Sequence, residues 1–179
     1  FPITWGTGVF HYIGGAFELG FASYWALQWI GPNAVLRAKA EEPVRLQDFL
    51  GVVDAIDQIE ESAYLQLPLR EMPYLKLGNG FAPFIKDMLE HDTYDEFYQK
   101  LSVRSRSNQL KVPAFCVAGW YDFILGNDLE HYRRIKEQGG SDAARNKTRL
   151  MIGPWAHGAF LNTVGELNFG MSSSGFLLE

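Results

Sequence analysis

Two apolar runs near the C-terminal end of the chain each finish in a turn and then present one polar side chain. The first is Val-Pro-Ala-Phe-Cys-Val-Ala-Gly-Trp-Tyr-Asp at residues 112–122, and the second is Leu-Met-Ile-Gly-Pro-Trp-Ala-His at residues 150–157. Such runs are typical of buried strands, and an open α/β sheet carries its chemistry at the carboxyl ends of its strands. Asp122 and His157 are therefore the first candidate site residues.

The residues between the two runs predict a helix that crosses from one strand to the next. A helix over 128–138 is indicated by apolar residues that recur on one face, namely Leu129, Tyr132 and Ile135. We expect Asn127 to cap it, Glu130 to complete a capping box and Gly139-Gly140 to end it in a left-handed conformation. A polar loop then leads to the second strand, which begins over 148–152. Strands joined by such a crossover run parallel when they share a sheet.

Parallel neighbouring strands place their carboxyl ends on the same edge, so Asp122 and His157, 35 positions apart, are expected to lie side by side. A carboxylate beside an imidazole fixes the tautomer of the histidine and stabilises its protonated form during nucleophilic catalysis. A plainer interpretation remains open, in which Asp122 is a turn or cap residue and His157 a solvated loop residue.

The same two runs resemble the paired C-terminal motifs of the CocE/NonD hydrolases, the group of cocaine esterase, α-amino-acid ester hydrolases and X-Pro dipeptidyl-peptidases. Residues 14–21 with Trp25 resemble the segment that opens the helical cap of these enzymes, and residues 164–170 resemble the stretch after their catalytic histidine. The resemblance implies that Asp122 is the acid and His157 the general base of a catalytic triad. It also implies a partial α/β-hydrolase fold, of class α/β, with a helical cap insertion.

The sequence lacks the motif that carries the nucleophilic serine in that family. Family members carry a serine in a Gly-x-Ser-Tyr-x-Gly elbow before the cap, and none of the nine serines here has glycine both two positions before and two after it. We therefore expect the chain to be a piece of a larger hydrolase, inactive alone, whose remaining partners are a nucleophile-bearing segment upstream and a β-sandwich downstream.

The organisation of the chain fits a cap over 1–110 and the C-terminal part of a hydrolase core over 111–179. The first region is expected to be helical and irregular, without strands, and the composition changes at Lys111-Val112-Pro113. Its expected helices cover 17–30, 47–63, 81–90 and 94–101, the last capped by Asp92-Thr93. Arg104 and Arg106 are interpreted as a solvated connector.

Three aromatic residues beside the proposed pair are candidates for the substrate pocket. Trp155 precedes His157 by two positions, and Trp120 and Tyr121 come immediately before Asp122. Aromatic side chains supply the apolar walls that small acyl substrates need, although core packing is the commoner role of such residues.

Composition excludes several other classes of protein. The net charge of −5 argues against a nucleic-acid partner, and no apolar stretch is long enough to span a membrane. A single cysteine rules out an internal disulfide, and a cytoplasmic location is expected. That cysteine, Cys116, lies inside an apolar strand and is expected to be inert, and the four histidines show no metal-ligand spacing. We expect no metal and no cofactor.

These observations predict that the parent protein is a serine acyl hydrolase acting on small esters or acyl-peptide substrates of the X-Pro type. The alternative is a noncatalytic lid or interaction fragment that keeps the shape of an α/β-hydrolase.

Overall fold

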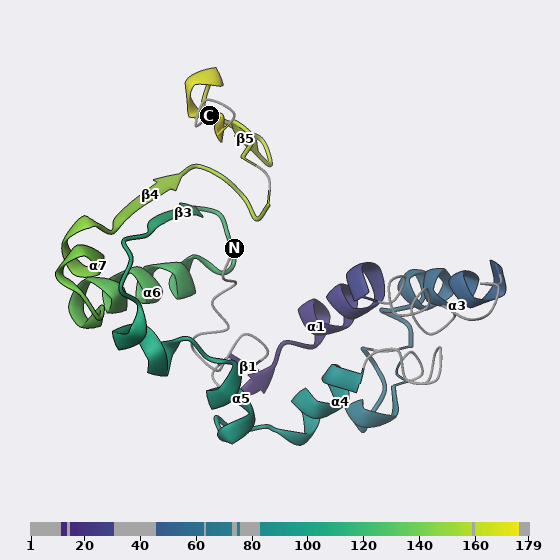
Figure 1. The fold of residues 1–179 in the computed structure, drawn as a ribbon. Helices are drawn as coiled ribbons and strands as arrows, with labels where there is room; N and C mark the ends of the chain where they lie inside the picture. The colour runs from purple at the N-terminus through teal and green to yellow at the C-terminus, as the bar shows by residue number, and fades with distance from the viewer. Residues whose placement is uncertain are drawn as a thin grey trace. The chain divides into compact units, whose positions relative to one another are not determined.

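The computed structural model describes residues 12–13, 15–30, 46–62, 64–72, 75, 83–158 and 160–175 (Figure 1). The chain divides into two compact units. Val9–Phe97 form one, here called the N-terminal unit, and Tyr98–Glu179 together with Phe1–Gly8 form the other, the C-terminal unit. The division into a cap over 1–110 and a core over 111–179 stays a prediction, because compactness alone does not assign those roles.

Two strands and two helices form the centre of the C-terminal unit. They are β3 (Phe115–Gly119), α6 (Leu125–Gln138), α7 (Asp142–Lys147) and β4 (Arg149–Gly153). The strands pair in parallel, with Phe115 opposite Arg149 and Gly119 opposite Gly153, and Figure 1 shows them side by side. The parallel pairing predicted from the crossover is confirmed, and both strands end at the same edge. This mixture of helix and strand agrees with the α/β class.

The crossover helix differs in detail from its sequence prediction. It begins at Leu125, so Asn127 lies inside the helix and Ile124 occupies the N-cap without a side-chain bond. Gly139 has φ −52° and ψ 140°, which is extended and not left-handed. The polar stretch after it is helical instead of a loop, because the Ser141 hydroxyl accepts a hydrogen bond from the Ala144 amide at 3.0 Å and caps α7.

A buried threonine ties the start of both strands to α7. The side chain of Thr148 is fully buried, and its hydroxyl donates to the Ala144 carbonyl at 2.6 Å while accepting from the Ala114 amide at 3.1 Å. The Arg149 amide donates to the Ala114 carbonyl at 2.9 Å, which continues the pairing to the strand ends. The register of the sheet is therefore fixed at its amino end by side-chain as well as backbone hydrogen bonds.

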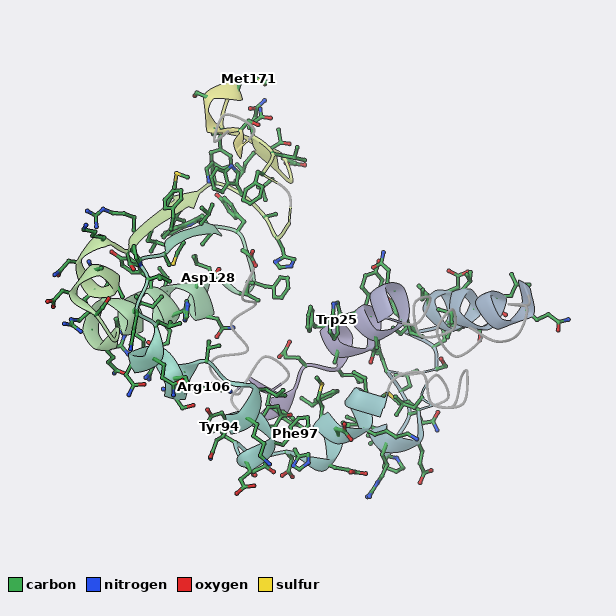
Figure 2. The ribbon with its side chains drawn as sticks, viewed as in Figure 1. Trp25, Tyr94, Phe97, Arg106, Asp128 and Met171 are labelled. Atoms are coloured by element: carbon green, nitrogen blue, oxygen red, sulfur yellow. The ribbon has the colours of Figure 1, made fainter. Side chains whose placement is uncertain are left out.

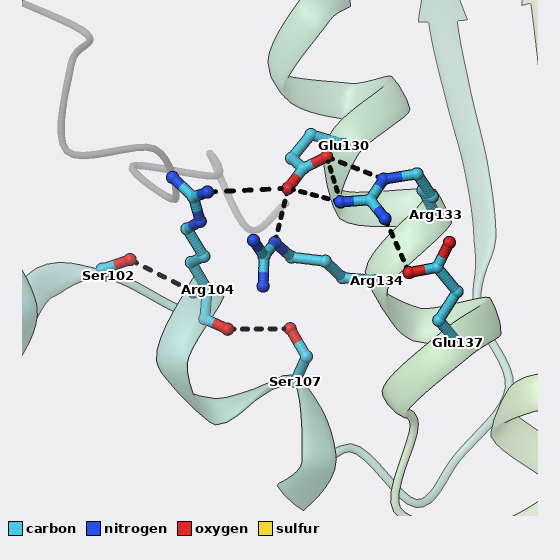
Figure 3. A network of polar contacts seen from close by, with 7 residues as sticks. All are labelled: Ser102, Arg104, Ser107, Glu130, Arg133, Arg134 and Glu137. Atoms are coloured by element: carbon cyan, nitrogen blue, oxygen red, sulfur yellow. Dashed lines mark hydrogen bonds and ion pairs between the residues drawn. The ribbon is translucent and has the colours of Figure 1, made fainter.

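An ion-pair network joins α6 to the preceding 3₁₀ helix η5 (Arg104–Gln109) (Figure 3). Glu130 accepts hydrogen bonds from Arg133 at 3.0 Å and from Arg134 at 2.6 Å, and Arg104 lies 3.9 Å from it. Glu130 therefore pairs forward along its helix and does not reach back as a capping-box residue. Arg104 is 41% exposed and Arg106 is exposed, as expected for a solvated connector, but the segment is helical and pairs with α6.

The described residues after β4 form a small hairpin and a 3₁₀ turn. These are β5 (Thr163–Val164), β6 (Leu167–Asn168) and η6 (Met171–Ser173). The strands β5 and β6 pair antiparallel, Thr163 opposite Asn168. Figure 2 labels Met171 at the end of this segment, where its side chain is 76% exposed.

Short helices make up most of the described part of the N-terminal unit. Its elements are β1 (Tyr12–Ile13), β2 (Ala16–Phe17), α1 (Leu19–Trp25), the π-helix η2 (Ala26–Ile30), α3 (Leu46–Asp57), η3 (Leu69–Glu71) and α4 (Pro83–Glu90). α5 (Glu96–Leu101) begins in this unit and ends in the other. The largest fully buried apolar side chains in the described part of the N-terminal unit are Leu27, Met72, Leu75 and Ile85.

Two expectations for this region are corrected by the structure. β1 and β2 form an antiparallel pair, with Tyr12 opposite Phe17, where the sequence predicted no strand. α5 is capped by Asp95, whose carboxylate accepts a hydrogen bond from the Phe97 amide at 2.9 Å, and not by Asp92-Thr93. In the described residues no helix has both the length and the apolar character needed to cross a membrane.

Candidate active site

The ends of β3 and β4 are held together beyond the last paired residues of the two strands. The Trp120 amide donates to the Gly153 carbonyl at 2.8 Å, and the Tyr121 amide donates to the Trp155 carbonyl at 3.0 Å. These two bonds join the turn that carries Asp122 to the turn that carries His157. The backbone thus brings two residues that are 35 positions apart to the same edge of the sheet.

The side chains of Asp122 and His157 are hydrogen-bonded to each other. The His157 Nδ1 atom lies 3.0 Å from Oδ2 and 3.1 Å from Oδ1 of Asp122. Because an ionised carboxylate can only accept, Nδ1 carries the proton, and the second ring nitrogen of a neutral imidazole is left as an acceptor. The Asp122 carboxylate also accepts from the Ile124 amide at 2.9 Å, which fixes its orientation.

Exposure differs between the two members of the pair in a way that suits acid–base chemistry. The side chain of Asp122 is 11% exposed, whereas that of His157 is 54% exposed. A shielded carboxylate interacts more strongly with the imidazole than one surrounded by water. The exposed imidazole remains accessible to a reacting group, so the arrangement can receive a proton at His157 and stabilise the resulting positive charge through Asp122.

A second carboxylate lies near this pair. Asp128 stands in the first turn of α6, and Figure 2 labels it on that helix. Burial raises the pKa of Asp128 to about 6, the negative charge of Asp122 adds to the rise, and His157 opposes it. The sequence marked Asp128 only as the first residue of the expected helix, and no spacing rule connected it with the pair.

The aromatic residues proposed for the substrate pocket differ in their environments. Trp120 is 63% exposed and Tyr121 is 43% exposed, whereas Trp155 is only 4% exposed. The Tyr121 ring lies 5.8 Å from that of Phe169. The sequence analysis missed Phe123, whose ring centroid is 4.6 Å from that of His157; its position immediately after Asp122 was the available signal.

Other nucleophilic or metal-binding groups have little support in the described residues. Burial raises the pKa of the Cys116 thiol, with a further rise from Asp128, as expected for a thiol that stays protonated. Burial lowers the pKa of His131, which favours its neutral form. No group of three or more potential metal ligands occurs in the parts of the chain that the structure describes.

Comparison with known proteins identifies the family of the chain. The family described as X-Pro dipeptidyl-peptidase (S15 family) matches residues 3–159. The cocaine esterase of Rhodococcus sp. (strain MB1 Bresler) is 27% identical over 161 residues, which cover 90% of this chain and 26% of that enzyme. The chain thus spans about a quarter of the length of the curated relative that it matches. It belongs to the S15 family of hydrolases, the family of X-Pro dipeptidyl-peptidases and cocaine esterase.

Proposed function

We propose that the full-length protein is a serine acyl hydrolase in which Asp122 and His157 are the acid and the base of a catalytic triad. One observation carries the proposal: the Nδ1 atom of His157 lies 3.0 Å from the Asp122 carboxylate, at the adjoining ends of two parallel strands. The burial of the acid and the exposure of the imidazole support it. Family membership supports the hydrolytic reaction class.

The proposed reaction is acyl transfer to a serine contributed by a segment outside this chain. The serine oxygen attacks the carbonyl carbon of the substrate while His157 takes the hydroxyl proton, and Asp122 stabilises the imidazolium. His157 then returns the proton to the leaving alcohol or amine. Water releases the acyl group by the same steps, with His157 again the base.

The substrate class proposed is a small ester or an acyl-peptide of the X-Pro type. The name of cocaine esterase indicates an ester substrate, and the family description X-Pro dipeptidyl-peptidase indicates a dipeptidyl unit. Trp120 and Tyr121 have exposed aromatic faces next to Asp122, which is where an apolar substrate group would contact the chain. The substrate contact predicted for Trp155 stays a prediction, as do the nucleophile-bearing segment and the β-sandwich.

The test is to assay the full-length protein with p-nitrophenyl acetate and with Gly-Pro-p-nitroanilide. His157→Ala is expected to lower kcat by about 10⁴-fold on the preferred substrate, because the serine loses its base. The matched control is His91→Ala, which removes a histidine that also contacts an aspartate, 2.5 Å from Asp95, but far along the chain from the proposed triad.

Rates for His157→Ala equal to those of the unmodified protein would remove His157 from the mechanism. No hydrolysis of either substrate by the unmodified protein would favour the noncatalytic alternative, a lid or interaction unit. Equal losses in His157→Ala and His91→Ala, with both variants folded by circular dichroism, would also count against the proposal, because the loss would not be specific to His157.

A further inference from the structure

Trp155 is held at several points by different parts of the C-terminal unit. Its carbonyl accepts the Tyr121 amide at 3.0 Å, and its indole N–H donates to the Ser173 carbonyl at 2.6 Å. Its ring meets Phe160 edge-on at 5.1 Å between centroids, and only 4% of the residue is exposed. Both its backbone and its side chain are therefore fixed.

Two glycines at the strand ends make room for this tryptophan. A Cβ atom added to Gly153 would lie 2.3 Å from the Trp155 ring, and one added to Gly119 would lie 2.3 Å from the Trp155 carbonyl oxygen. Gly119 and Gly153 are register partners in β3 and β4. The last pair of the sheet thus lacks side chains at the place where Trp155 packs.

The chain after Trp155 is anchored as well. The Gly175 amide donates to the Phe160 carbonyl at 2.8 Å, and the Ser174 hydroxyl lies 3.4 Å from the same oxygen. A Cβ atom on Gly175 would lie 2.3 Å from the Cβ of Phe160, so this contact is also close. Phe160 and Ser173, which both contact the indole, are consequently joined through the Ser173–Gly175 segment.

We propose that Trp155 is a positioning residue that sets the His157–Asp122 geometry by bonding the Asp122 turn through its carbonyl and locking the His157 turn through its buried indole. This inference rests on the proposed function. Tyr121, which bonds the Trp155 carbonyl, immediately precedes Asp122, and His157 follows Trp155 by two residues. The residue thus acts on both halves of the pair at once.

A positioning role and a substrate contact make different predictions for the kinetics. A residue that touches substrate only in binding changes KM when it is altered, whereas one that aligns a catalytic group changes kcat. Trp155→Phe in the full-length protein removes the indole N–H and keeps an aromatic ring. We expect kcat to fall about tenfold with KM within about twofold, since small misplacements of a reacting group are costly.

A spectroscopic measurement follows the hydrogen bond itself. The downfield imidazole N–H proton of His157 reports its bond to Asp122, and in Trp155→Phe we expect it to broaden or move upfield. The matched control is Trp120→Phe, an exposed tryptophan next to the same turn, which is expected to leave this resonance unchanged. An unchanged resonance in Trp155→Phe, or a raised KM with unchanged kcat, would overturn the positioning role.

A double-mutant cycle tests whether the glycine acts through the tryptophan. Gly153→Ala is expected to lower kcat by about 10-fold to 100-fold, because its new methyl group displaces the indole. In a Trp155→Leu background the ring atoms that clash are gone, and the same change is expected to cost at most about threefold. Equal losses in both backgrounds would contradict the proposal.

The outcomes separate this inference from the proposed function. If His157→Ala retains full activity, the triad assignment fails, but the His157 resonance still shows whether Trp155 positions the imidazole. If His157→Ala is inactive while Trp155→Phe preserves kcat and the resonance, the triad stands and the positioning role fails.

Discussion

Two aspartate–histidine pairs occur among the residues that the structure describes, one in each unit, and they are built in opposite ways. In the C-terminal unit, residues 35 positions apart are brought to 3.0 Å by two parallel strands. In the N-terminal unit, His91 and Asp95 are four positions apart, and His91 Nδ1 lies 2.5 Å from Asp95 Oδ2 in the turn between α4 and α5.

The partners of the two pairs also differ. Asp95 caps α5 through the Phe97 amide, and the His91 ring stacks on the Phe97 ring at 4.5 Å with 3° between the planes. The side chain of Asp95 is 38% exposed, whereas that of Asp122 is 11% exposed. An aspartate–histidine contact by itself is therefore not evidence of a catalytic role. The strand-end position and the shielded acid distinguish the pair of the C-terminal unit.

The largest difference is expected when the acid of each pair is neutralised in the full-length protein. Asp122→Asn should lower kcat by about 10⁴-fold, because an amide no longer selects the Nδ1-protonated tautomer and cannot stabilise the imidazolium. Asp95→Asn should leave kcat within about twofold, since it lies in a helix cap. Initial rates with the preferred p-nitrophenyl or p-nitroanilide substrate measure both.

A similar loss in the two variants would end the distinction between a catalytic and a structural pair. Circular dichroism of each variant, compared with the unmodified protein, excludes unfolding as the cause of lost activity.

The sheet of β3 and β4, which brings Asp122 to His157, can be weakened at its amino end. Thr148→Val removes a fully buried hydroxyl and leaves the Ala114 amide and the Ala144 carbonyl without their partner. We expect a loss of about 2 kcal/mol in the free energy of unfolding of the C-terminal unit, because one buried and one partly buried polar group lose a hydrogen bond each. Hydrogen exchange should accelerate in β3 and β4 and remain unchanged around His91.

Thr163→Val is the matched control, because Thr163 lies on the exposed side of β5. A comparable effect of the two substitutions would show that the Thr148 hydroxyl does not hold the register.

The sequence was most informative where a pattern reflects long-range geometry. Two apolar runs and an intervening helix predicted the parallel strands and hence the meeting of Asp122 with His157. Residue-by-residue capping was less predictable. Asn127 is a good cap in isolation, but the backbone already turns into α6 at Leu125, directly after the Asp122 turn. The tertiary connection therefore overrode the local preference.

Elements with no periodic signal were missed for a different reason. The strands β1 and β2 have two residues each, too few to show alternation, and α7 has six mostly polar residues. The surroundings of Asp128 on α6, and of Trp155 against Phe160, Ser173 and the ends of β3 and β4, depend on packing that spacing along the chain does not encode. Their burial could be found only from the structure.

The pH dependence of stability at Asp128 tests the electrostatics around the Asp122–His157 pair. Its folded-state pKa of about 6 lies above the ordinary value of 3.8, so the folded protein holds this proton more tightly than the unfolded chain does. The associated stability is present below about pH 4 and is lost as the pH rises through about 6. Asparagine has no such proton to lose. The free energy of unfolding of Asp128→Asn, relative to that of the unmodified protein, should therefore rise by about 1–2 kcal/mol from pH 4 to pH 7.5, allowing for partial burial.

Denaturant midpoints at the two pH values measure this change. Asp142→Asn is the control, because it removes a carboxylate that is 88% exposed and lies in a different helix. A gain that is the same at both pH values would mean that the Asp128 carboxyl is not the group that titrates.

The smallest expected effect concerns the local pair, where cap and ion pair can be separated. Asp95→Ala removes both the bond to the Phe97 amide and the contact with His91, and should cost about 1 kcal/mol, as typical of a lost helix cap. His91→Ala removes the contact with Asp95 and the stacking on Phe97 but leaves the cap, and should cost about 0.5 kcal/mol, because both side chains of the ion pair are more than a third exposed. Hydrogen exchange of the Phe97 amide measures the difference. If His91→Ala accelerated exchange as much as Asp95→Ala, the histidine would have to be essential to the cap, and the local pair would resemble the Asp122–His157 pair more closely than its geometry indicates.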